Sequence, residues 1–178
     1  HNAFVDAAPA VDDLYVEGRW QTWLAGGLGG GGNLDPETRL PTGVIADDTR
    51  IGTGAIYVLD VTDPDSFASN SPANIVKGEW TSQTLTCEGR LDAKACGEHL
   101  GNTLGTPLIR KLHNGNWGII FPNGQNSQSG RSGLFILLID PKSGEQSFRF
   151  LPAGLPETNA KGEITLRNGI TQVAAVDL

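Results

Sequence analysis

The chain has 178 residues, which is enough for one domain with a hydrophobic core. Hydrophobic residues make up 38% of it and charged residues 19%, a balance that excludes a disordered chain. The formal net charge of -7 argues against a nucleic-acid groove, which needs a basic face, and no apolar run approaches the ~20 residues of a membrane helix. The chain begins at His1 and contains no methionine, so we expect an internal or processed piece of a longer protein.

Short runs of β-branched and aromatic residues recur along the chain, separated by Gly, Asn, Asp and Pro, whereas helical periodicity is nearly absent. In chain order, the first four runs predict strands at residues 8–16, 19–27, 54–62 and 77–82. The next four predict strands at residues 106–113, 116–124, 133–141 and 146–153. We therefore expect an all-β fold.

The second group of strands repeats the first in the same order. Four pairs of residues match between the copies: Pro9 with Pro107, Trp20 with Trp117, Gly27 with Gly124, and Asp60 with Asp140. The separation of the matched residues shortens after the second strand, which places an insert at residues 33–51 of the first copy. Another copy begins near the end, where residues 173–178 align with the first strand of each group.

Repeated groups of four strands are typical of β-propellers, in which each blade is a small sheet covered on both faces by its neighbours. We interpret the chain as a β-propeller segment of about two blades. Blade 1 covers about residues 3–84, a cysteine loop covers 85–100, blade 2 covers about 104–153, and the next blade starts at 170–178. Known propellers close with about four to eight blades, so we expect the remaining blades in the same chain or in another.

A glycine-rich loop follows the second predicted strand, and Gly27, Gly29 and Gly32 fit the spacing G-x-G-x-x-G. A dinucleotide site needs a helix directly after these glycines, because the helix N-terminus binds the pyrophosphate. Here Pro41 and Gly43 interrupt any helix after one turn, although Asp47 and Asp48 stand where a ribose-binding acid would be. The repeat instead predicts a hairpin loop and no cofactor.

The two cysteines, Cys87 and Cys96, flank a short turn-prone segment. A disulfide between them is the preferred prediction and implies an oxidising compartment. Free thiols in a cytosolic protein are the alternative. A metal site is poorly supported because neither cysteine belongs to a C-x-x-C pair.

No arrangement of catalytic residues is recognisable. The segment around Ser132 lacks the G-x-S-x-G spacing of a nucleophile elbow, and we expect His99 and His113 to be solvated loop residues. Paired carboxylates occur at Asp12 and Asp13, at Asp47 and Asp48, and along residues 60–65, and none of them has the spacing of a known catalytic or metal site. We predict that Asp60 and Asp140 accept backbone amides in the turn after the third strand.

The tryptophans Trp20, Trp23, Trp80 and Trp117 allow two interpretations. They could form an aromatic face that stacks on carbohydrate. The repeat favours a structural role instead, at least for the matched pair Trp20 and Trp117.

Five segments, taken in order, resemble the C-terminal propeller of the type IV pilus tip-associated adhesins of the PilC/PilY type. They are FVDAAPAVDDLYV, WQTWLAGGLGGGG, GTGAIYVLDVTDP, LGNTLGTPLIRKLH and NGNWGIIFPNGQNS. The resemblance covers nearly the whole chain except the insert and the cysteine loop. Each motif is weak alone, but their order is fairly specific.

The resemblance implies a quinoprotein-like propeller on an exported bacterial protein at the outer membrane, the pilus tip or the cell surface. Such proteins act in pilus assembly, adhesion and twitching motility, and they are not known as enzymes. Pilin or minor pilin subunits and a host surface receptor are the implied partners. The family also binds Ca²⁺ in a loop whose first ligand would correspond to Asp177, one residue before the end of this sequence. Ca²⁺ needs six to eight oxygen ligands, so we expect the site to be complete only in a longer protein.

Two other functions remain open on the same fold. One is a quinone-dependent dehydrogenase, which would need a cofactor cavity at the centre of a complete ring. The other is a periplasmic scaffold that docks proteins unrelated to pili. For the pilus-associated function, we expect residues 33–51 and the Cys87–Cys96 loop to be the interaction elements, because loops on a rigid scaffold tolerate variation.

Overall fold

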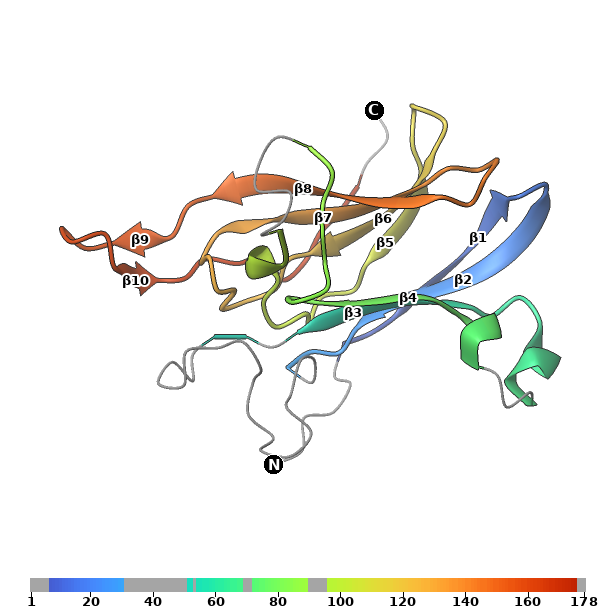
Figure 1. Cartoon of the computed structure of the whole chain (residues 1–178), viewed down its shortest axis with the longest axis horizontal. Helices are drawn as coiled ribbons and strands as arrows, with labels where there is room; N and C mark the ends of the chain where they lie inside the picture. The colour runs from blue at the N-terminus through green and yellow to red at the C-terminus, as the bar shows by residue number, and fades with distance from the viewer. Residues whose placement is uncertain (1–6, 31–50, 53, 69–71, 90–95, 176–178) are drawn as a thin grey trace.

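The computed structural model describes residues 7–30, 51–52, 54–68, 72–89 and 96–175. These residues form two four-stranded antiparallel sheets and a small hairpin (Figure 1). The predicted all-β fold is confirmed. In the described part of the chain, all helices are short 3-10 turns, none of them long and apolar enough to cross a membrane.

Sheet 1 contains four strands that follow one another in space in the order of the chain. They are β1 (Ala10–Val16), β2 (Arg19–Gly27), β3 (Ala55–Asp60) and β4 (Val76–Thr81). Two 3-10 turns, η1 (Pro64–Ala68) and η2 (Pro72–Asn74), lie between β3 and β4. Each predicted strand of the first copy is therefore present, and β2 has the predicted bounds.

Sheet 2 repeats this meander after a third 3-10 turn, η3 (Cys96–His99). Its strands are β5 (Leu108–Lys111), β6 (Trp117–Pro122), β7 (Ser132–Ile139) and β8 (Gln146–Gly154). A hairpin of β9 (Glu157–Thr158) and β10 (Ile164–Leu166) follows, which the sequence did not predict. Residues 171–175 carry no strand and residues 176–178 lie outside the described residues, so the next blade stays a prediction.

The two sheets pack face to face as two layers, with sheet 2 above sheet 1 in the view of Figure 1. On one side Asp12 of β1 forms an ion pair with Arg110 of β5 at 3.6 Å. On the other side the ring of Trp80 in β4 meets the ring of Phe148 in β8 edge-on, with 4.8 Å between centroids. Buried residues of both sheets form one core cluster between the layers: Leu14, Val16, Trp23, Ala25, Ile56 and Val58 from sheet 1, and Ile109, Ile119, Phe121, Phe135, Leu137, Ile139 and Phe148 from sheet 2.

The sheets use opposite faces for this contact. Asp60 and Asp140 each follow the apolar residues of the third strand, and each accepts the backbone N–H of the residue two positions later. We therefore take them as equivalent positions of the two sheets. Val58 of sheet 1 then corresponds to Leu138 of sheet 2. Val58 is buried in the core, but Leu138 lies on the outer face, where it is half-buried. The sheets therefore stack front to back, as successive repeats, and are not related as mirror layers.

Strand register corrects the matches made from the sequence for Trp20 and Gly27. Gly27 pairs with Ile56, so its equivalent in sheet 2 is Ile120, which pairs with Ile136, and not Gly124. Trp117 of β6 pairs with Ile139, the residue before Asp140. Its equivalent in sheet 1 is Leu24, which pairs with Leu59, and not Trp20. Trp20 lies further along the β1–β2 hairpin, which is longer than the β5–β6 hairpin. Both matches failed because a difference in hairpin length shifts the alignment of the strands that follow.

Candidate functional site

The Cys87–Cys96 loop lies in the connection between β4, an edge strand of sheet 1, and β5, an edge strand of sheet 2. Cys87 and Cys96 form the predicted disulfide, with 5.7 Å between their Cα atoms, and both are buried. On the side of sheet 2, the Glu88 backbone N–H donates to the Phe148 carbonyl at 2.8 Å, and Leu85 is buried in the shared core. Both ends of the loop are therefore fixed to the scaffold, while residues 90–95 lie outside the described residues.

A shallow cavity of about 190 Å³ lies beside the disulfide, lined by Trp80, Cys87, Glu88 and Phe148 among others. Glu88 also forms an exposed ion pair with Arg149 at 3.2 Å. Binding sites for cofactors and drug-sized ligands usually enclose about 300–1,000 Å³. This cavity is therefore too small to hold a quinone or a dinucleotide.

His99, predicted to be a solvated loop residue, is buried at 5% exposure, and that prediction is wrong. Its ring stacks on Phe150 with 4.3 Å between centroids, and Nδ1 lies 2.7 Å from the Ser129 hydroxyl. The misjudgement arose because the burial of a loop residue depends on tertiary packing that sequence patterning does not report. His113 is exposed in the β5–β6 turn, as predicted.

Asn123 joins three segments at the end of sheet 2 that carries the β6–β7 loop. Its side chain is fully buried and makes four hydrogen bonds. Nδ2 donates to the carbonyls of His99 and Arg131, each at 2.8 Å. Oδ1 accepts the backbone N–H groups of Gly133 and Ile170, each at 3.1 Å. One side chain thus holds together the η3 segment, the β6–β7 loop and the segment leading to the C-terminal end of the described chain.

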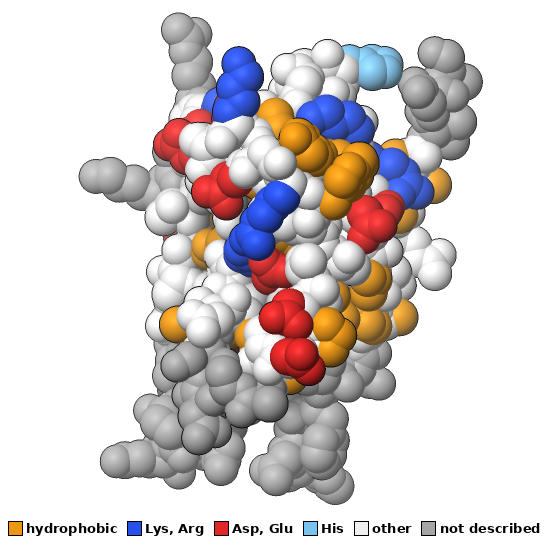
Figure 2. Space-filling model, turned by 90° about the vertical axis from the view of Figure 1, so that its right-hand side faces the viewer, with side chains coloured by type: hydrophobic (Ala, Val, Ile, Leu, Met, Phe, Trp, Pro, Cys, Tyr) orange, Lys and Arg blue, Asp and Glu red, His pale blue; other side chains and the backbone are white. Residues whose placement is uncertain are grey.

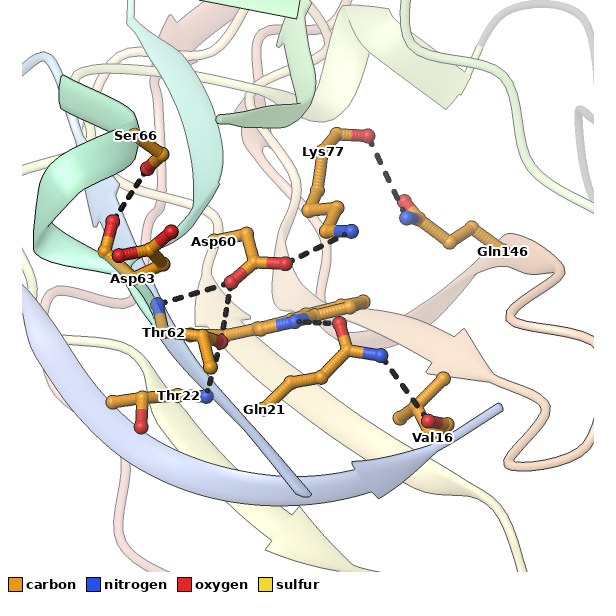
Figure 3. A network of polar contacts seen from close by, with 10 residues as sticks. Val16, Gln21, Thr22, Asp60, Thr62, Asp63, Ser66, Lys77 and Gln146 are labelled. Atoms are coloured by element: carbon orange, nitrogen blue, oxygen red, sulfur yellow. Dashed lines mark hydrogen bonds and ion pairs between the residues drawn. The ribbon is translucent and has the colours of Figure 1, made fainter. Parts of the chain in front are cut away.

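Asp60 is the centre of a polar network at the opposite end of sheet 1 (Figure 3). Its carboxylate accepts hydrogen bonds from the Thr62 backbone and hydroxyl and forms an ion pair with Lys77 at 3.1 Å. The Thr62 hydroxyl in turn accepts the backbone N–H of Thr22 in β2 at 2.9 Å. Burial opposes ionisation of Asp60, but the bonds from Thr62 and Lys77 outweigh burial and hold the pKa of Asp60 below its usual value.

The predicted role of Asp60 and Asp140 in turns is confirmed. Backbone N–H groups of Ser143 and Lys142 donate to Asp140 Oδ1 at 2.9 and 2.8 Å, and these bonds lower the pKa of Asp140. Among the described residues, no three His, Cys, Asp or Glu side chains are placed to hold a metal ion. Asp47, Asp48 and Asp177 lie outside the described residues.

The glycine-rich loop joins two antiparallel neighbours, β2 and β3, as the hairpin interpretation predicts. Gly27 packs directly against Thr103, and a Cβ at this position would overlap the Thr103 carbonyl oxygen. Gly29 has a φ of 62° and exchanges two backbone hydrogen bonds with Thr103. Two of these glycines thus let the backbone approach the segment before β5, while Gly32 lies outside the described residues.

The four tryptophans do not form a common face. Trp23 is buried in the core, while Trp80 and Trp117 are partly buried against it. Trp117 also donates its Nε1–H to the Tyr15 carbonyl of sheet 1 at 3.1 Å. Trp20 is 64% exposed, so the predicted structural role is confirmed for Trp117 and not for Trp20. Ser132 begins β7 and occupies no nucleophile elbow.

Both outer faces of the stacked sheets are partly apolar. Sheet 1 presents Leu24, Tyr57 and Leu59, and sheet 2 presents Ile120, Leu134, Ile136 and Leu138, all of them half-buried. The end of the molecule formed by the β1–β2 turn and η1 has a different character. There, charges of both signs are interspersed with apolar side chains (Figure 2). The candidate functional surfaces are therefore the two sheet faces, the disulfide loop and this turn end.

Comparison with known proteins identifies relatives of one kind, although no family model matches the chain. It is 31% identical over 137 residues to the type IV pilus biogenesis factor PilY1 homolog of Xylella fastidiosa (strain Temecula1), which is 77% of this chain and 7% of that protein. It is also 31% identical over 144 residues to PilY1 of Pseudomonas aeruginosa (strain UCBPP-PA14), 81% of this chain and 9% of that protein. The crystal structure of the Pseudomonas aeruginosa PilY1 C-terminal domain matches 97% of this chain with a TM-score of 0.56 and 26% identity.

This chain is a relative of the PilY1 C-terminal domain. The family resemblance stated from the sequence is confirmed. The chain spans less than a tenth of the length of these curated PilY1 proteins and 25% of the solved domain. The match with the PilY1 C-terminal domain includes both sheets and their connections, since it covers nearly all of the chain.

The burial of two polar residues of this PilY1-type segment, Asn123 and Gln21, was not predicted from the sequence. Asn123 stands in an Asn-Gly pair that reads as an ordinary turn, and only the convergence of three segments shows its role. Gln21 is 1% exposed and connects Val16 to the Trp23 indole through two hydrogen bonds of 3.1 Å. The signal that could have found Gln21 is its position on the same strand face as the apolar residues Trp23 and Ala25, which follow it at a spacing of two.

Proposed function

We propose that this chain serves type IV pilus biogenesis as part of a larger, non-enzymatic protein that acts through its surfaces. The observation that carries the proposal is the match of the whole two-sheet unit to the PilY1 C-terminal domain. The small size of the cavity beside the disulfide is compatible with a surface function. No observation on the described residues favours the dehydrogenase or the unrelated scaffold over this function.

We further propose that the two sheets are successive blades of a propeller. The front-to-back stacking supports this, because each outer face is then equivalent to a face that is already buried. Tyr57 and Leu59 on the outer face of sheet 1 correspond to Leu137 and Ile139, which are buried in the core. Outer faces of this kind fit neighbouring sheets that dock in the same manner. Those sheets would belong to the remainder of the longer protein or to another chain.

The proposed location is outside the cytoplasm, on the cell surface or the pilus. The disulfide supports this, since such bonds persist in oxidising compartments. In this setting the Cys87–Cys96 loop is a suitable contact for pilin or minor pilin subunits, because it is covalently closed and anchored to both sheets. Adhesion to a host receptor and twitching motility are further functions that the same surfaces would serve.

Calcium binding remains a proposal for a longer protein. The described residues hold no cluster of three acidic, His or Cys side chains suited to a metal. Ca²⁺ takes six to eight oxygen ligands, so Asp177 could supply only the first of them. We propose that a chain continuing beyond Leu178 supplies the others, and that calcium would then regulate the pilus function.

The test is to replace, in the gene that encodes these residues, the segment 1–178 by a flexible linker and to measure pilin sheared from the cell surface. We expect surface pilin to fall strongly while the remaining protein is still exported. A matched control deletes only residues 159–162 at the tip of the β9–β10 hairpin, which lies away from the disulfide loop and both sheet faces. Unchanged surface pilin after the large replacement, with the altered protein present at its normal level, would overturn the proposal.

A further inference from the structure

The β1–β2 hairpin projects beyond the repeat that the two sheets share. With Leu24 equivalent to Trp117, the last residue pair of the β5–β6 ladder, Lys111 with Trp117, corresponds to Val11 with Leu24. One further hydrogen-bonded pair, Leu112 with Asn116, corresponds to Asp12 with Trp23. The pairs beyond it, from Asp13 with Thr22 to Val16 with Arg19, have no equivalent strand pair in sheet 2. A neighbouring sheet that packs as these two sheets pack would therefore leave the outer face of this projection uncovered.

The outer face of the projection carries two cross-strand pairs, Tyr15 with Trp20 and Asp13 with Thr22. We call these four residues the aromatic platform. Tyr15 and Trp20 are 45% and 64% exposed, and their rings meet edge-on with 5.5 Å between centroids. The Thr22 hydroxyl donates to Asp13 Oδ1 at 2.6 Å, which fixes the exposed carboxylate one step along the same face.

The platform is rigid because the opposite face of the hairpin is buried. Leu14 and Val16 are at most 1% exposed, and Trp117 of sheet 2 donates to the Tyr15 carbonyl at 3.1 Å. The Glu17 backbone N–H donates to the Pro141 carbonyl at 2.9 Å, so the turn itself is attached to sheet 2. Single exposed apolar residues are common on protein surfaces. A preorganised Tyr–Trp pair is different, because it offers contact area at low entropic cost.

We propose that the aromatic platform binds a neutral pyranose unit of a glycan. The apolar C–H face of the sugar ring would stack on the Trp20 indole, and a ring hydroxyl would donate to Asp13 Oδ2. Residues two apart on one strand face are about 7 Å apart, a spacing that suits one sugar ring. A protein partner would need a contiguous apolar patch, but here the aromatic pair is followed directly by a carboxylate and a hydroxyl. The same carboxylate and the net charge of -7 disfavour a nucleic acid. The inference goes beyond the pilus function and does not depend on a closed propeller.

The test uses the 178-residue chain labelled with ¹⁵N and titrated with methyl β-galactoside, methyl α-mannoside and N-acetylglucosamine. The indole Nε1–H signal of Trp20 is assigned by its loss in Trp20→Phe. We expect at least one of these sugars to shift this signal with a dissociation constant of about 1 mM, typical of a single small contact site. The indole signals of Trp23, Trp80 and Trp117 should stay in place, since those side chains are buried or partly buried.

Two matched pairs of variants separate the platform from a nonspecific effect. Trp20→Ala should abolish the response, while Phe67→Ala, which removes another half-exposed aromatic side chain (51%), should leave it unchanged. Asp13→Asn should weaken binding at least about fivefold through loss of a hydrogen bond to a charged group. Asp12→Asn, on the other face of the same strand beside Arg110, should not. The proposal is overturned if none of the three sugars shifts the Trp20 signal, if Asp12→Asn weakens binding as much as Asp13→Asn, or if the platform is buried by a second copy of the chain in solution.

Discussion

Replacing Asn123 by leucine is expected to destabilise the fold strongly, because the leucine side chain has the same branched shape but makes none of the four hydrogen bonds of this fully buried position. The Arg131 carbonyl keeps a long contact of 3.4 Å with the Ser127 hydroxyl. The His99 carbonyl and the N–H groups of Gly133 and Ile170 lose the bond to Asn123. A buried polar group that loses its partner costs about 1–3 kcal/mol, so the N–H groups of Gly133 and Ile170 alone predict a loss of about 2–6 kcal/mol. That is a large part of the stability of a typical domain, which is about 5–15 kcal/mol.

The assay is equilibrium unfolding in urea followed by tryptophan fluorescence. The control is Asn114→Leu in the exposed β5–β6 turn, where the same chemical change should cost less than about 1 kcal/mol. The free energy of unfolding should fall at an unchanged urea dependence, since the fold itself is retained. A loss below about 1 kcal/mol for Asn123→Leu, or a loss equal to that of the control, would refute the argument.

Asn123→Asp sharpens the same prediction. The new carboxylate still accepts the N–H groups of Gly133 and Ile170, but its second oxygen faces the carbonyls of His99 and Arg131. Repulsion between these oxygens favours the protonated acid in the folded protein, so the folded-state pKa of the new group is raised. Destabilisation should therefore be large at neutral pH and decrease on acidification. A loss of stability that does not change with pH would contradict this placement of the amide.

Three further predictions concern the rest of the scaffold. Replacing both Cys87 and Cys96 by serine should lower the free energy of unfolding by about 2–3 kcal/mol, because the disulfide closes a short loop with a sequence separation of 9. Urea unfolding of the wild type and the double variant, with and without reductant, measures this difference. Equal stabilities of the two proteins without reductant would contradict the prediction. The pKa of Asp60 is lower in the folded protein than in the unfolded chain, where it is about 3.9. The ionised carboxylate therefore stabilises the fold at a pH above about 3.9, and this stabilisation is lost as the pH falls through the folded-state pKa. The stability difference between the wild type and Asp60→Asn should therefore shrink below about pH 4, and a difference that grows on acidification would show the sign to be wrong. Gly27→Ala should cost about 1–3 kcal/mol through overlap with the Thr103 carbonyl, whereas Gly162→Ala in the open β9–β10 turn should cost only its backbone strain, and thermal unfolding compares the two.

Much of the fold was predictable because strand formation depends on local patterns. The alternation of apolar residues and the turn residues between them located all eight strands of the two sheets, and a repeated Asp marked the same turn in both copies. The length of a hairpin cannot be read from such a pattern. The match of Trp20 with Trp117 was therefore wrong, because the β1–β2 hairpin is longer than the β5–β6 hairpin. The short β9–β10 hairpin was missed because two or three residues give no measurable alternation.

The candidate sites were less predictable because they depend on contacts between distant segments. The burial of His99 results from packing against Phe150, which lies 51 residues further along the chain. Asn123 acquires its role from partners in the η3 segment, the β6–β7 loop and the C-terminal segment. The disulfide was predictable because its partners are close in sequence and no third cysteine competes for them.

The differences between the two sheets indicate where function resides. Both sheets share the elements that the stack needs, namely four strands, an Asp after the third strand and one apolar face for each neighbour. The β1–β2 projection, the long β2–β3 connection and the disulfide loop occur only with sheet 1, and the β9–β10 hairpin follows only sheet 2. Of the additions, the β1–β2 projection combines a buried, fixed inner face with an exposed aromatic and acidic outer face. An exposed Trp20 at this position does not stabilise the packing of the two sheets. Binding of a ligand, as proposed for the aromatic platform, is therefore the better explanation for it.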